Sequence, residues 1–599
     1  MFNKLVNEPG LVRSRARLMG TLTLVAGLVS ACGGGGGGSD QADRLTEAPR
    51  ARSTEAAAAA PSSSVSGGEA LLAVAPVLTQ RQAVRLAEQT TFGQYEWLVG
   101  YMRTKTPSQW LYEQFNSGGS RYVSGGGAEL HQFTGPGQFC DTRGTHCWRD
   151  WSSNQPLLWD FYRNALTQPD QLRQRVAWAL SQMVVVSNVE VESTYGLRNY
   201  QNMLLMNAFG NYREVLKKVA LSPVMGSYLG NVNNDKTAPN ENFARELLQL
   251  FAIGPCHLNN DATLASGTCL PTYDDQQVRA YAYALTGWIY PPGGSSPSGC
   301  WPQGTHCRFH NGDMVAQPAR HDTQARTLLT GLYLPAGHTA PQALDAVIES
   351  LMRHPSMAPF VSRQLIQHLV TSNPSPAYVN RVVSAFNSGS HAGFGTGVRG
   401  DLKATVAAVL LDTEAREEPT SPTAGRLREP VQMFLGVIRA LNGQTDGDSL
   451  GWWWGDMLGQ HAFRAPSVFN YYSPSYPLPQ TNLVGPTFAL HGASTALARI
   501  NFVHHAVNWG APVNTNIPNA VGTKVDLANF LPDANDPPKL VDRLSLLALG
   551  ELLPPTNRAQ VIDAVNAFTP QTGGVDYLRS RVRSAAYLVF STPQYHVVR

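Results

Sequence analysis

Apolar residues recur with the spacing of an α-helix along most of this chain, and no other feature of the sequence constrains the fold as much. Thr79 is a typical N-cap ahead of an amphipathic run over residues 80–87, and Gly93 is a typical stop beyond that run. Residues 172–186 begin amphipathic and become apolar on all sides, as expected of a central helix. The same periodicity predicts helices over residues 240–253, 274–289, 343–353, 358–370, 378–386, 402–411, 429–441, 537–549 and 577–589.

Alternating strand patterns are scarce, which favours a mainly α class. The folded part, residues 76–599, is longer than an average domain, but it contains no second Gly/Ser-rich linker and no strong internal repeat. We therefore expect a large multi-helical globular domain, built as two helical lobes that share one body, with long loops closed by disulfides.

The first 31 residues have the features of a bacterial lipoprotein signal peptide. An apolar run over residues 18–29, too short to span a bilayer, follows four positive residues, Lys4, Arg13, Arg15 and Arg17. The run leads into Val29-Ser30-Ala31-Cys32, which resembles a lipobox, the motif in which the cysteine sulfur is acylated. The alternative is an ordinary cleaved signal with a free cysteine nearby.

The residues after Cys32 predict where the protein is held. Gly33 stands where lipoproteins retained in the inner membrane have Asp, so the resemblance favours an outer-membrane lipoprotein of the cell envelope, on the periplasmic or the surface side. Residues 32–75 are rich in Gly, Ser, Ala and Pro, and we expect them to form a flexible tether. The lipid would then be the only membrane attachment.

The charge of the chain argues against a nucleic-acid partner. Residues 1–31 hold four of the 46 Lys and Arg and one of the 43 Asp and Glu, so the remaining chain has 42 of each. A neutral chain without basic blocks lacks the electrostatic footprint that nucleic-acid binding requires.

The cysteines also indicate export. Besides Cys32, six cysteines fall into three local pairs, Cys140 with Cys147, Cys256 with Cys269 and Cys300 with Cys307. In an oxidising compartment an even set of this kind indicates disulfides, although spacing alone does not fix which cysteines pair. Two of the loops end in Gly-Thr-His-Cys, which leaves a Cys/His metal site as the alternative. Structural zinc sites usually have ligands closer together within each pair.

Polar residues gather at the start of the helix predicted over residues 240–253, namely Asn240, Glu241, Asn242, Arg245 and Glu246. Glu241 with Arg245, and Asn242 with Glu246, are four residues apart and therefore neighbours on a helix. One hypothesis is an anion, metal or substrate site built from Asn240, Glu241, Arg245 and Glu246. The other is a polar network that satisfies itself, caps the helix and locks nearby loops.

Other catalytic patterns are weak. His310, His321 and Asp322 lie close in sequence and could join the acids of that helix in a metal site, but a loop histidine is more often solvated. The sequence has no nucleophile elbow, no zinc-protease motif, no Walker loop and no Rossmann fingerprint. We therefore assign no metal ligand, and the cofactor stays unknown.

Aromatic residues offer a binding surface instead. Trp452, Trp453 and Trp454 stand between two glycines, and Tyr471 and Tyr472 precede a Ser/Pro-rich stretch. Flat rings on loops can stack on sugar faces or grip a protein partner. The alternative is that the rings fill gaps between helices.

Several long motifs follow one another along the folded region. They are PNENFARELLQLFAIG (residues 239–254), YDDQQVRAYAYALTGW (273–288), HPSMAPFVSRQLIQHLV (354–370), RGDLKATVAAVLLDTEAR (399–416), LREPVQMFLGVIRAL (427–441) and APSVFNYYSPSYP (465–477). Together with His321-Asp322 they resemble the bacterial family called domain of unknown function 1800. The resemblance implies a large, exported, mainly helical protein, with an exported partner of sulfatase-like or phosphatase-like fold. It implies no catalytic residues.

Two functional hypotheses follow. The first is a lipid-anchored envelope protein that binds or assembles with another exported protein or with a surface polysaccharide, through Asn240, Asn242 and the Trp and Tyr residues above. The alternative is a periplasmic hydrolase centred on Asn240, Glu241, Arg245 and Glu246, which His321 and Asp322 could join. The hydrolase hypothesis requires the side chains of its polar centre to converge in an open cleft, whereas the binding hypothesis does not.

Overall fold

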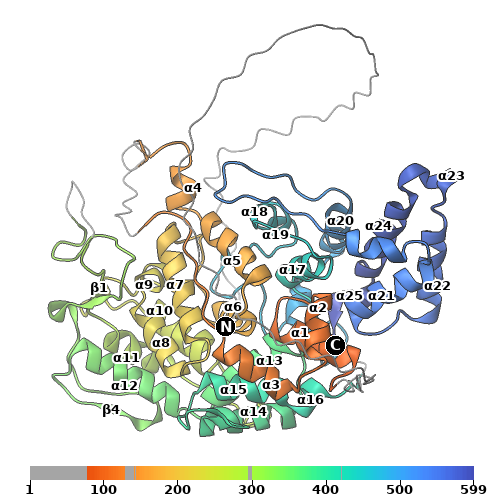
Figure 1. Cartoon of the computed structure of the whole chain (residues 1–599). Coiled ribbons are helices and arrows are strands. Elements are labelled where there is room, and N and C mark those ends of the chain that lie inside the picture. The colour runs from red at the N-terminus through yellow and green to blue at the C-terminus, as the bar shows by residue number, and fades with distance from the viewer. Residues whose placement is uncertain (1–76, 128–139, 142, 294–299, 420, 422) are drawn as a thin grey trace, which may run out of the picture. The chain divides into compact units, whose positions relative to one another are not determined.

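The computed structural model describes residues 77–127, 140–141, 143–293, 300–419, 421 and 423–599. The predicted signal peptide, Cys32 and the predicted tether lie outside these residues. The described part is mainly α, as the sequence predicts (Figure 1).

The helices of the first half are α1 (Gln80–Thr90), α2 (Glu96–Met102), α3 (Pro107–Asn116), α4 (Cys147–Trp151), α5 (Gln155–Thr167), α6 (Gln171–Met183), α7 (Thr194–Asn207), α8 (Tyr212–Leu221), α9 (Pro223–Tyr228), α10 (Asn242–Glu246), η1 (Leu247–Ala252), α11 (Asp275–Ala284), η2 (Pro318–Arg320) and η3 (Leu329–Gly331). Those of the second half are α12 (Ala340–Arg353), α13 (Met357–Leu369), α14 (Pro376–Ser388), α15 (Leu402–Leu411), α16 (Thr413–Arg416), α17 (Pro430–Ala440), α18 (Asp448–Gly451), α19 (Trp454–Met457), η4 (Pro486–Leu490), α20 (Ala493–Asn508), η5 (Ala528–Asp533), α21 (Pro537–Leu549), α22 (Pro555–Asn566), α23 (Pro570–Gly573), η6 (Gly574–Asp576), α24 (Tyr577–Phe590) and α25 (Pro593–His596).

Local capping chemistry sets several helix starts. Thr79 begins α1 with a capping box: its hydroxyl accepts from the Gln82 backbone, and the Gln82 side chain accepts from the Thr79 backbone. The helices α15 and α21 occupy the residues that periodicity predicts. By contrast, the periodicity analysis did not identify α5 or α7, in which more than half of the residues are buried.

The described strands form two-residue antiparallel pairs. These are β1 (Trp288–Ile289) with β2 (Val315–Ala316), β3 (Arg326–Thr327) with β4 (Tyr333–Leu334), β5 (Ser390–His391) with β6 (Phe394–Gly395), and β7 (Arg426–Leu427) with β8 (Val597–Val598).

The strand β1 corrects one sequence prediction. The helix expected to reach residue 289 ends with α11 at Ala284, and β1 follows it. Gly287 lies between them with a φ of +86°, and a Cβ there would come within 2.6 Å of the His321 side chain. A left-handed glycine packed this tightly cannot continue a helix.

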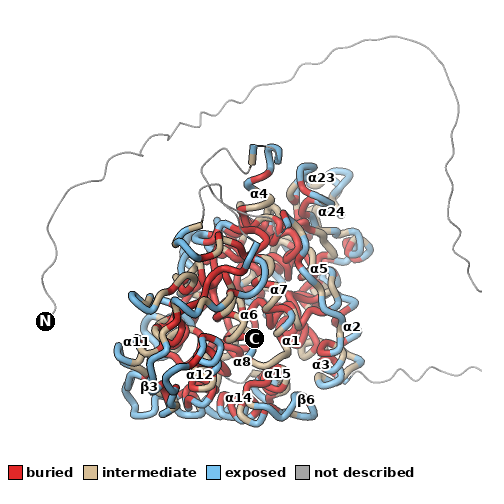
Figure 2. Tube along the Cα trace, turned by 90° about the vertical axis from the view of Figure 1, so that its left-hand side faces the viewer, coloured by how far each residue is buried: buried red, intermediate tan, exposed pale blue. Residues whose placement is uncertain are grey.

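The core is continuous. One cluster of buried apolar side chains extends from Leu78 to Tyr595, and residues 74–599 form one compact unit. Figure 2 shows buried segments along the inner helices and exposed stretches in the outer loops. The helices thus share one body, as expected, but their contacts do not divide residues 74–599 into the two lobes that the sequence suggested. Among the described helices, each is too short or too polar to span a bilayer.

The local cysteine pairing is confirmed. Cys140–Cys147, Cys256–Cys269 and Cys300–Cys307 are disulfides, with Cα–Cα distances of 5.5, 5.0 and 4.8 Å. Sulfur atoms bonded to each other are unavailable as thiolate ligands, so the Cys/His metal alternative is wrong for these loops.

Candidate functional site

The Asn-rich segment before α10 is held by hydrogen bonds between its own residues, although Asn231 Nδ2 and Asn233 Oδ1 are buried without a partner among the described residues. The backbone N–H of Asn240 donates to Asn234 Oδ1 (2.7 Å), and Asn240 Oδ1 accepts from the Asn242 backbone (2.9 Å). The helix therefore begins at Asn242, two residues later than predicted, and both Asn240 and Asn242 are exposed. This arrangement is the capping network that the sequence left as one of two hypotheses.

The charges of α10 are engaged in surface ion pairs. Glu241 binds Arg245 (3.2 Å) and Arg279 (3.1 Å), and Arg245 also lies 3.4 Å from Asp275. Glu246 is only 8% exposed. Burial raises the pKa of Glu246 although the nearby charge of Arg245 acts to lower it, and its Oε2 has no hydrogen-bond partner among the described residues. Glu246 forms no ion pair with Arg245 in the described part of the chain, but it lies within reach of that charge.

The predicted histidine cluster is spread over different partners. His321 is buried; its Nδ1 donates to the Thr286 carbonyl (2.9 Å), and its Nε2 lies 3.1 Å from Nδ1 of His338. Asp322 pairs with Arg326, whereas His310 Nε2 lies 3.1 Å from the Ser227 hydroxyl. In the described part of the chain, no three His, Cys, Asp or Glu side chains are placed to hold a metal ion.

The three tryptophans differ in burial. Trp454 is buried against Phe502 (ring centroids 5.4 Å apart), and Trp452 is half-buried against His461 (4.8 Å). Trp453 is 47% exposed and stacks on Trp454 at 5.1 Å. Most of this run is therefore core packing, with one ring at the surface.

Of the two predicted tyrosines, Tyr472 lines a cavity, whereas Tyr471 holds the neighbouring backbone. Tyr471 donates to the His461 carbonyl and accepts from the Arg464 backbone (2.5 and 3.1 Å), which fixes the chain before residue 473. Tyr472 is buried and lines a cavity of about 400 Å³, a volume typical of small-molecule sites. Residues from α6, η1, α13, β7 and the segment 468–475 line this cavity.

The helix α13 presents one polar face to the cavity. Phe360, Arg363, Gln364, Gln367 and His368 all line it, and their spacing of three and four residues places them on one side of the helix. Gln367 donates to the Ser372 and Pro474 carbonyls (both 3.1 Å). The Gln367 hydrogen bonds therefore join α13 to the segment 468–475, which also lines the cavity.

The segment after α10 forms a second wall. The stretch over residues 247–252 is a π-helix, a distortion that often marks functional sites, and its Gln249 and Leu250 line the cavity. Gly254 follows with a φ of +73°, and a Cβ there would lie 2.7 Å from the Phe360 ring. The family-like motif that begins at residue 239 thus reaches the cavity through its second half.

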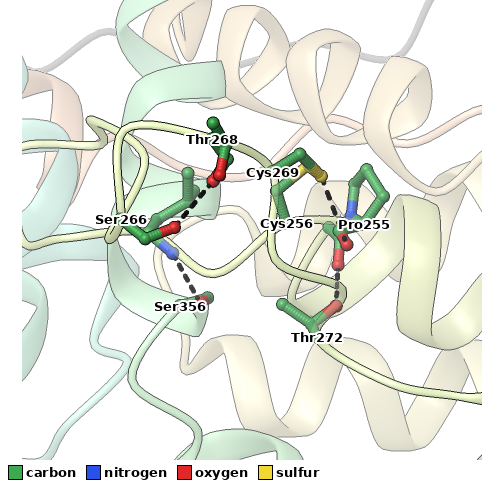
Figure 3. The surroundings of a disulfide bond; sticks show 9 residues. Pro255, Cys256, Ser266, Thr268, Cys269, Thr272 and Ser356 are labelled. Atoms are coloured by element: carbon green, nitrogen blue, oxygen red, sulfur yellow. Dashed lines mark hydrogen bonds between the residues drawn. A yellow bond between two sulfur atoms is a disulfide. The ribbon is translucent and has the colours of Figure 1, made fainter.

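A disulfide holds the rim beside this wall (Figure 3). Cys256 lines the cavity and is bonded to Cys269, which closes the loop between them. The Thr272 hydroxyl donates to the Gly254 carbonyl, and Ser356 Oγ accepts from the Leu258 backbone (3.1 Å). These contacts fix the loop against the start of α13.

Behind the cavity lies a buried carboxylate, Glu429. Its oxygens accept from Trp178 Nε1 (3.0 Å), Gln460 Nε2 (2.7 Å) and Gln182 Nε2 (3.3 Å), and Arg175 Nη1 lies at 3.9 Å. Burial acts to raise the pKa of Glu429, but its cationic neighbours Arg175 and Arg426 and the Gln460 hydrogen bond outweigh it and hold that pKa below its ordinary value. Glu429 is therefore ionised.

The hydroxyl of Tyr472 connects the cavity wall to this carboxylate. It lies 2.9 Å from Gln182 Oε1 and 3.2 Å from Glu429 Oε2, so its single proton serves one of two acceptors. Asn470 Nδ2 donates to the same Gln182 oxygen (3.2 Å). Tyr472, Gln182 and Asn470 are thus held in fixed positions on the cavity wall.

The lining is largely apolar, with cationic and polar groups set among its apolar side chains. Arg363 and Arg426 are its permanent charges, and Asp and Glu are absent among its described residues. Burial lowers the pKa of His368 to about 4, so His368 is neutral near pH 7. Amide and hydroxyl side chains such as Gln249 and Thr487 supply most of the other polar groups, and Phe469 is exposed at the edge.

The sequence contained one signal for this site that periodicity analysis missed. Within the apolar helix over residues 357–369, the pairs Arg363-Gln364 and Gln367-His368 repeat four residues apart. Polar residues at that spacing on an otherwise buried helix mark a face turned toward solvent or a cavity.

The structure defines a mainly α protein with disulfide-closed loops and a cavity whose lining includes two arginines. A family model described as "Protein of unknown function (DUF1800)" matches residues 85–597. The chain belongs to this family, which confirms the resemblance found in its motifs. Comparison with curated proteins and with solved structures found no match.

Proposed function

We propose that this protein is an exported, lipid-anchored envelope protein that binds a surface saccharide in the cavity beside α13. Its sequence supports the location, through the lipobox at Cys32 and an even set of further cysteines. The cavity supports binding, because its size and its many fixed amide and hydroxyl groups suit a polyhydroxylated ligand.

The composition of the lining carries this proposal. A sugar offers both hydrogen-bond donors and acceptors, and the side chains of Gln249, Gln364 and Thr487 can supply both. Two aromatic rings, Phe360 and Phe469, supply flat apolar surface for a sugar face.

Binding is favoured over glycoside hydrolysis at this cavity. Most glycosidases use a pair of carboxyl groups that flank the bond to be cut. The described lining has no carboxyl group, and Glu429 behind it is occupied by hydrogen bonds.

The hydrolase alternative centred on Asn240, Glu241, Arg245 and Glu246 has weaker support. It requires these side chains to converge in an open cleft. Glu241 and Arg245 instead form surface ion pairs, and Glu246 is buried without an ion pair to them among the described residues. The exported partner of sulfatase-like or phosphatase-like fold stays a separate hypothesis, which rests on the family resemblance alone.

A blocked cavity tests the proposal. The full-length protein in detergent should bind saccharide purified from the envelope of its host, as measured by isothermal titration calorimetry. Ser475→Trp places a bulky ring at the rim of the cavity, where Ser475 is exposed, and should weaken binding at least tenfold. Ser384→Trp, at an exposed position on α14 outside the cavity, is the matched control and should bind as the wild type does.

Equal affinity of the two tryptophan variants would place the saccharide elsewhere on the molecule. Failure of the wild type to bind any envelope saccharide, together with a membrane pull-down that recovers no glycan, would refute the proposed function.

A further inference from the structure

One arginine of the cavity has no polar partner in the described part of the chain. Arg363 is half-buried on α13 and lines the cavity, yet it makes no hydrogen bond or ion pair with another described residue. Burial lowers the pKa of Arg363, because it costs free energy to hold the charged guanidinium group away from water. A guanidinium group has five N–H donors and no acceptor, so Arg363 presents only donors to the cavity.

A second arginine is only partly satisfied. Arg426 is 5% exposed; its Nη2 donates to the neutral amide oxygen of Gln432 at 2.5 Å, and its Nε has no partner. The acid nearest in the sequence, Glu429, is already engaged by Arg175 and by hydrogen bonds from three other side chains.

A third unsatisfied group is also a donor. Gln364 is 7% exposed and lines the cavity, and its Nε2 has no hydrogen-bond acceptor. The unsatisfied groups of Arg363, Arg426 and Gln364 are thus all donors. Buried donors without acceptors are costly, so a ligand rich in acceptor oxygens and negative charge complements this wall.

We propose that the cavity binds a sugar residue carrying an oxyanion, a carboxylate or a sulfate ester, which accepts hydrogen bonds from Arg363 and Arg426. This inference rests on the proposed function and narrows its ligand to acidic saccharides. The planar fork of an arginine matches the paired oxygens of both groups.

Three trisaccharides of equal length test the inference by calorimetry on the full-length protein. The probes are a galacturonate trimer, a sulfated galactose trimer and a neutral galactose trimer. We expect at least one acidic trimer to bind tenfold or more tightly than the neutral one, and the tighter of the two identifies the oxyanion. Arg363→Gln should reduce that affinity to the level of the neutral trimer.

The matched control is Arg353→Gln, because Arg353 is exposed on α12 and pairs only with Glu349. Its affinity for all three probes should equal that of the wild type.

Thermal stability separates a ligand-binding arginine from a structural one. Arg363→Gln breaks no hydrogen bond or ion pair among the described residues, so its Tm should equal or exceed that of the wild type. Arg439→Gln removes four hydrogen bonds, to the carbonyls of Gly93, Ala165 and Leu166 and to Gln171 Oε1, and should lower the Tm clearly.

The outcomes are distinct. No preference for either acidic trimer, or no loss of affinity in Arg363→Gln, overturns the inference and leaves the proposed function standing if envelope saccharide still binds. A Tm loss in Arg363→Gln as large as that in Arg439→Gln also overturns it. Absence of binding to every saccharide, envelope material included, overturns both.

Discussion

At the scale of single residues, Glu429 is the charge on which the cavity wall depends. It accepts hydrogen bonds from α6 and from Gln460, and it is the only acid beside Arg175 among the described ion pairs. Glu429→Ala should lower the free energy of unfolding by about 3–5 kcal/mol, because it leaves the guanidinium of Arg175 buried without a counter-charge. Urea denaturation measures this change, and a loss below about 1 kcal/mol would contradict the assigned role.

Arg245 provides the contrasting case. Its side chain is 38% exposed and its partners Glu241 and Asp275 lie near the surface, so solvent screens both pairs. Arg245→Ala should cost less than about 1 kcal/mol of unfolding free energy, again measured in urea. A cost as large as that of Glu429→Ala would mean that the Asn240 segment holds a buried network after all.

At the scale of elements, the disulfide loop 256–269 should be coupled to binding. Replacing both Cys256 and Cys269 by Ser should cost about 3 kcal/mol in chain entropy, as expected for a loop of this length. Because Cys256 lines the cavity, saccharide affinity should also fall severalfold.

The control is the double replacement of Cys140 and Cys147 by Ser. That disulfide lies outside the cavity lining, so stability should fall by a similar amount while affinity stays unchanged. If both double variants bound equally well, the loop 256–269 would have no part in the site.

The sequence predicted which segments are helical better than it predicted where those helices begin and end. Helical periodicity found α15 and α21 at their observed residues, and an aspartate side chain caps the start of each helix. It missed the π-helix over residues 247–252, whose hydrogen bonds are one residue longer than those of an α-helix and leave no periodicity signal. It placed Asn240 inside the helix, although the Asn234 side chain holds it before the start.

The site was less predictable than the fold. Tyr472 was identified from composition. Arg363, Gln364 and Arg426 can be recognised as site residues only in the structure, in which α13 and β7 line the same cavity. Nothing in the sequence shows that Arg363 lacks an acid partner, because that depends on which helices pack together. Conversely, Glu241 and Arg245 look like a site in sequence because ion pairs and catalytic groups use the same residue types.

At the scale of the whole molecule, buried histidines should make the fold sensitive to acid. Burial lowers the pKa of His354 and His368 to about 4 and that of His596 to about 3, whereas an unfolded histidine titrates near 6.5. Between pH 6.5 and 4 the unfolded chain therefore binds more protons than the folded one. Stability should be fully present above pH 6.5 and should fall as the pH drops toward 4.

Urea denaturation at pH 7, 6, 5 and 4.5 measures this slope, which amounts to at most about 1.4 kcal/mol per pH unit for each histidine. His354→Gln removes one of the three groups and should flatten the slope. Equal unfolding free energies at pH 7 and 4.5 would contradict the neutral, buried state of these side chains.

The lipid anchor is a prediction about the whole protein as well. Cys32→Ala should release the protein from membranes while its far-ultraviolet circular dichroism and Tm stay unchanged, because Cys32 precedes the compact unit of residues 74–599. Fractionation of cells followed by mass spectrometry of the N-terminal peptide measures this. Continued pelleting of the variant with membranes would refute anchoring through this sulfur.

The most direct test of the account is a crystal structure of the protein grown with the acidic trisaccharide that binds best. The account predicts density for the sugar in the cavity beside α13, with the oxyanion within hydrogen-bond distance of the Arg363 and Arg426 guanidinium groups. Sugar bound at another surface, with the cavity holding only solvent, would contradict it.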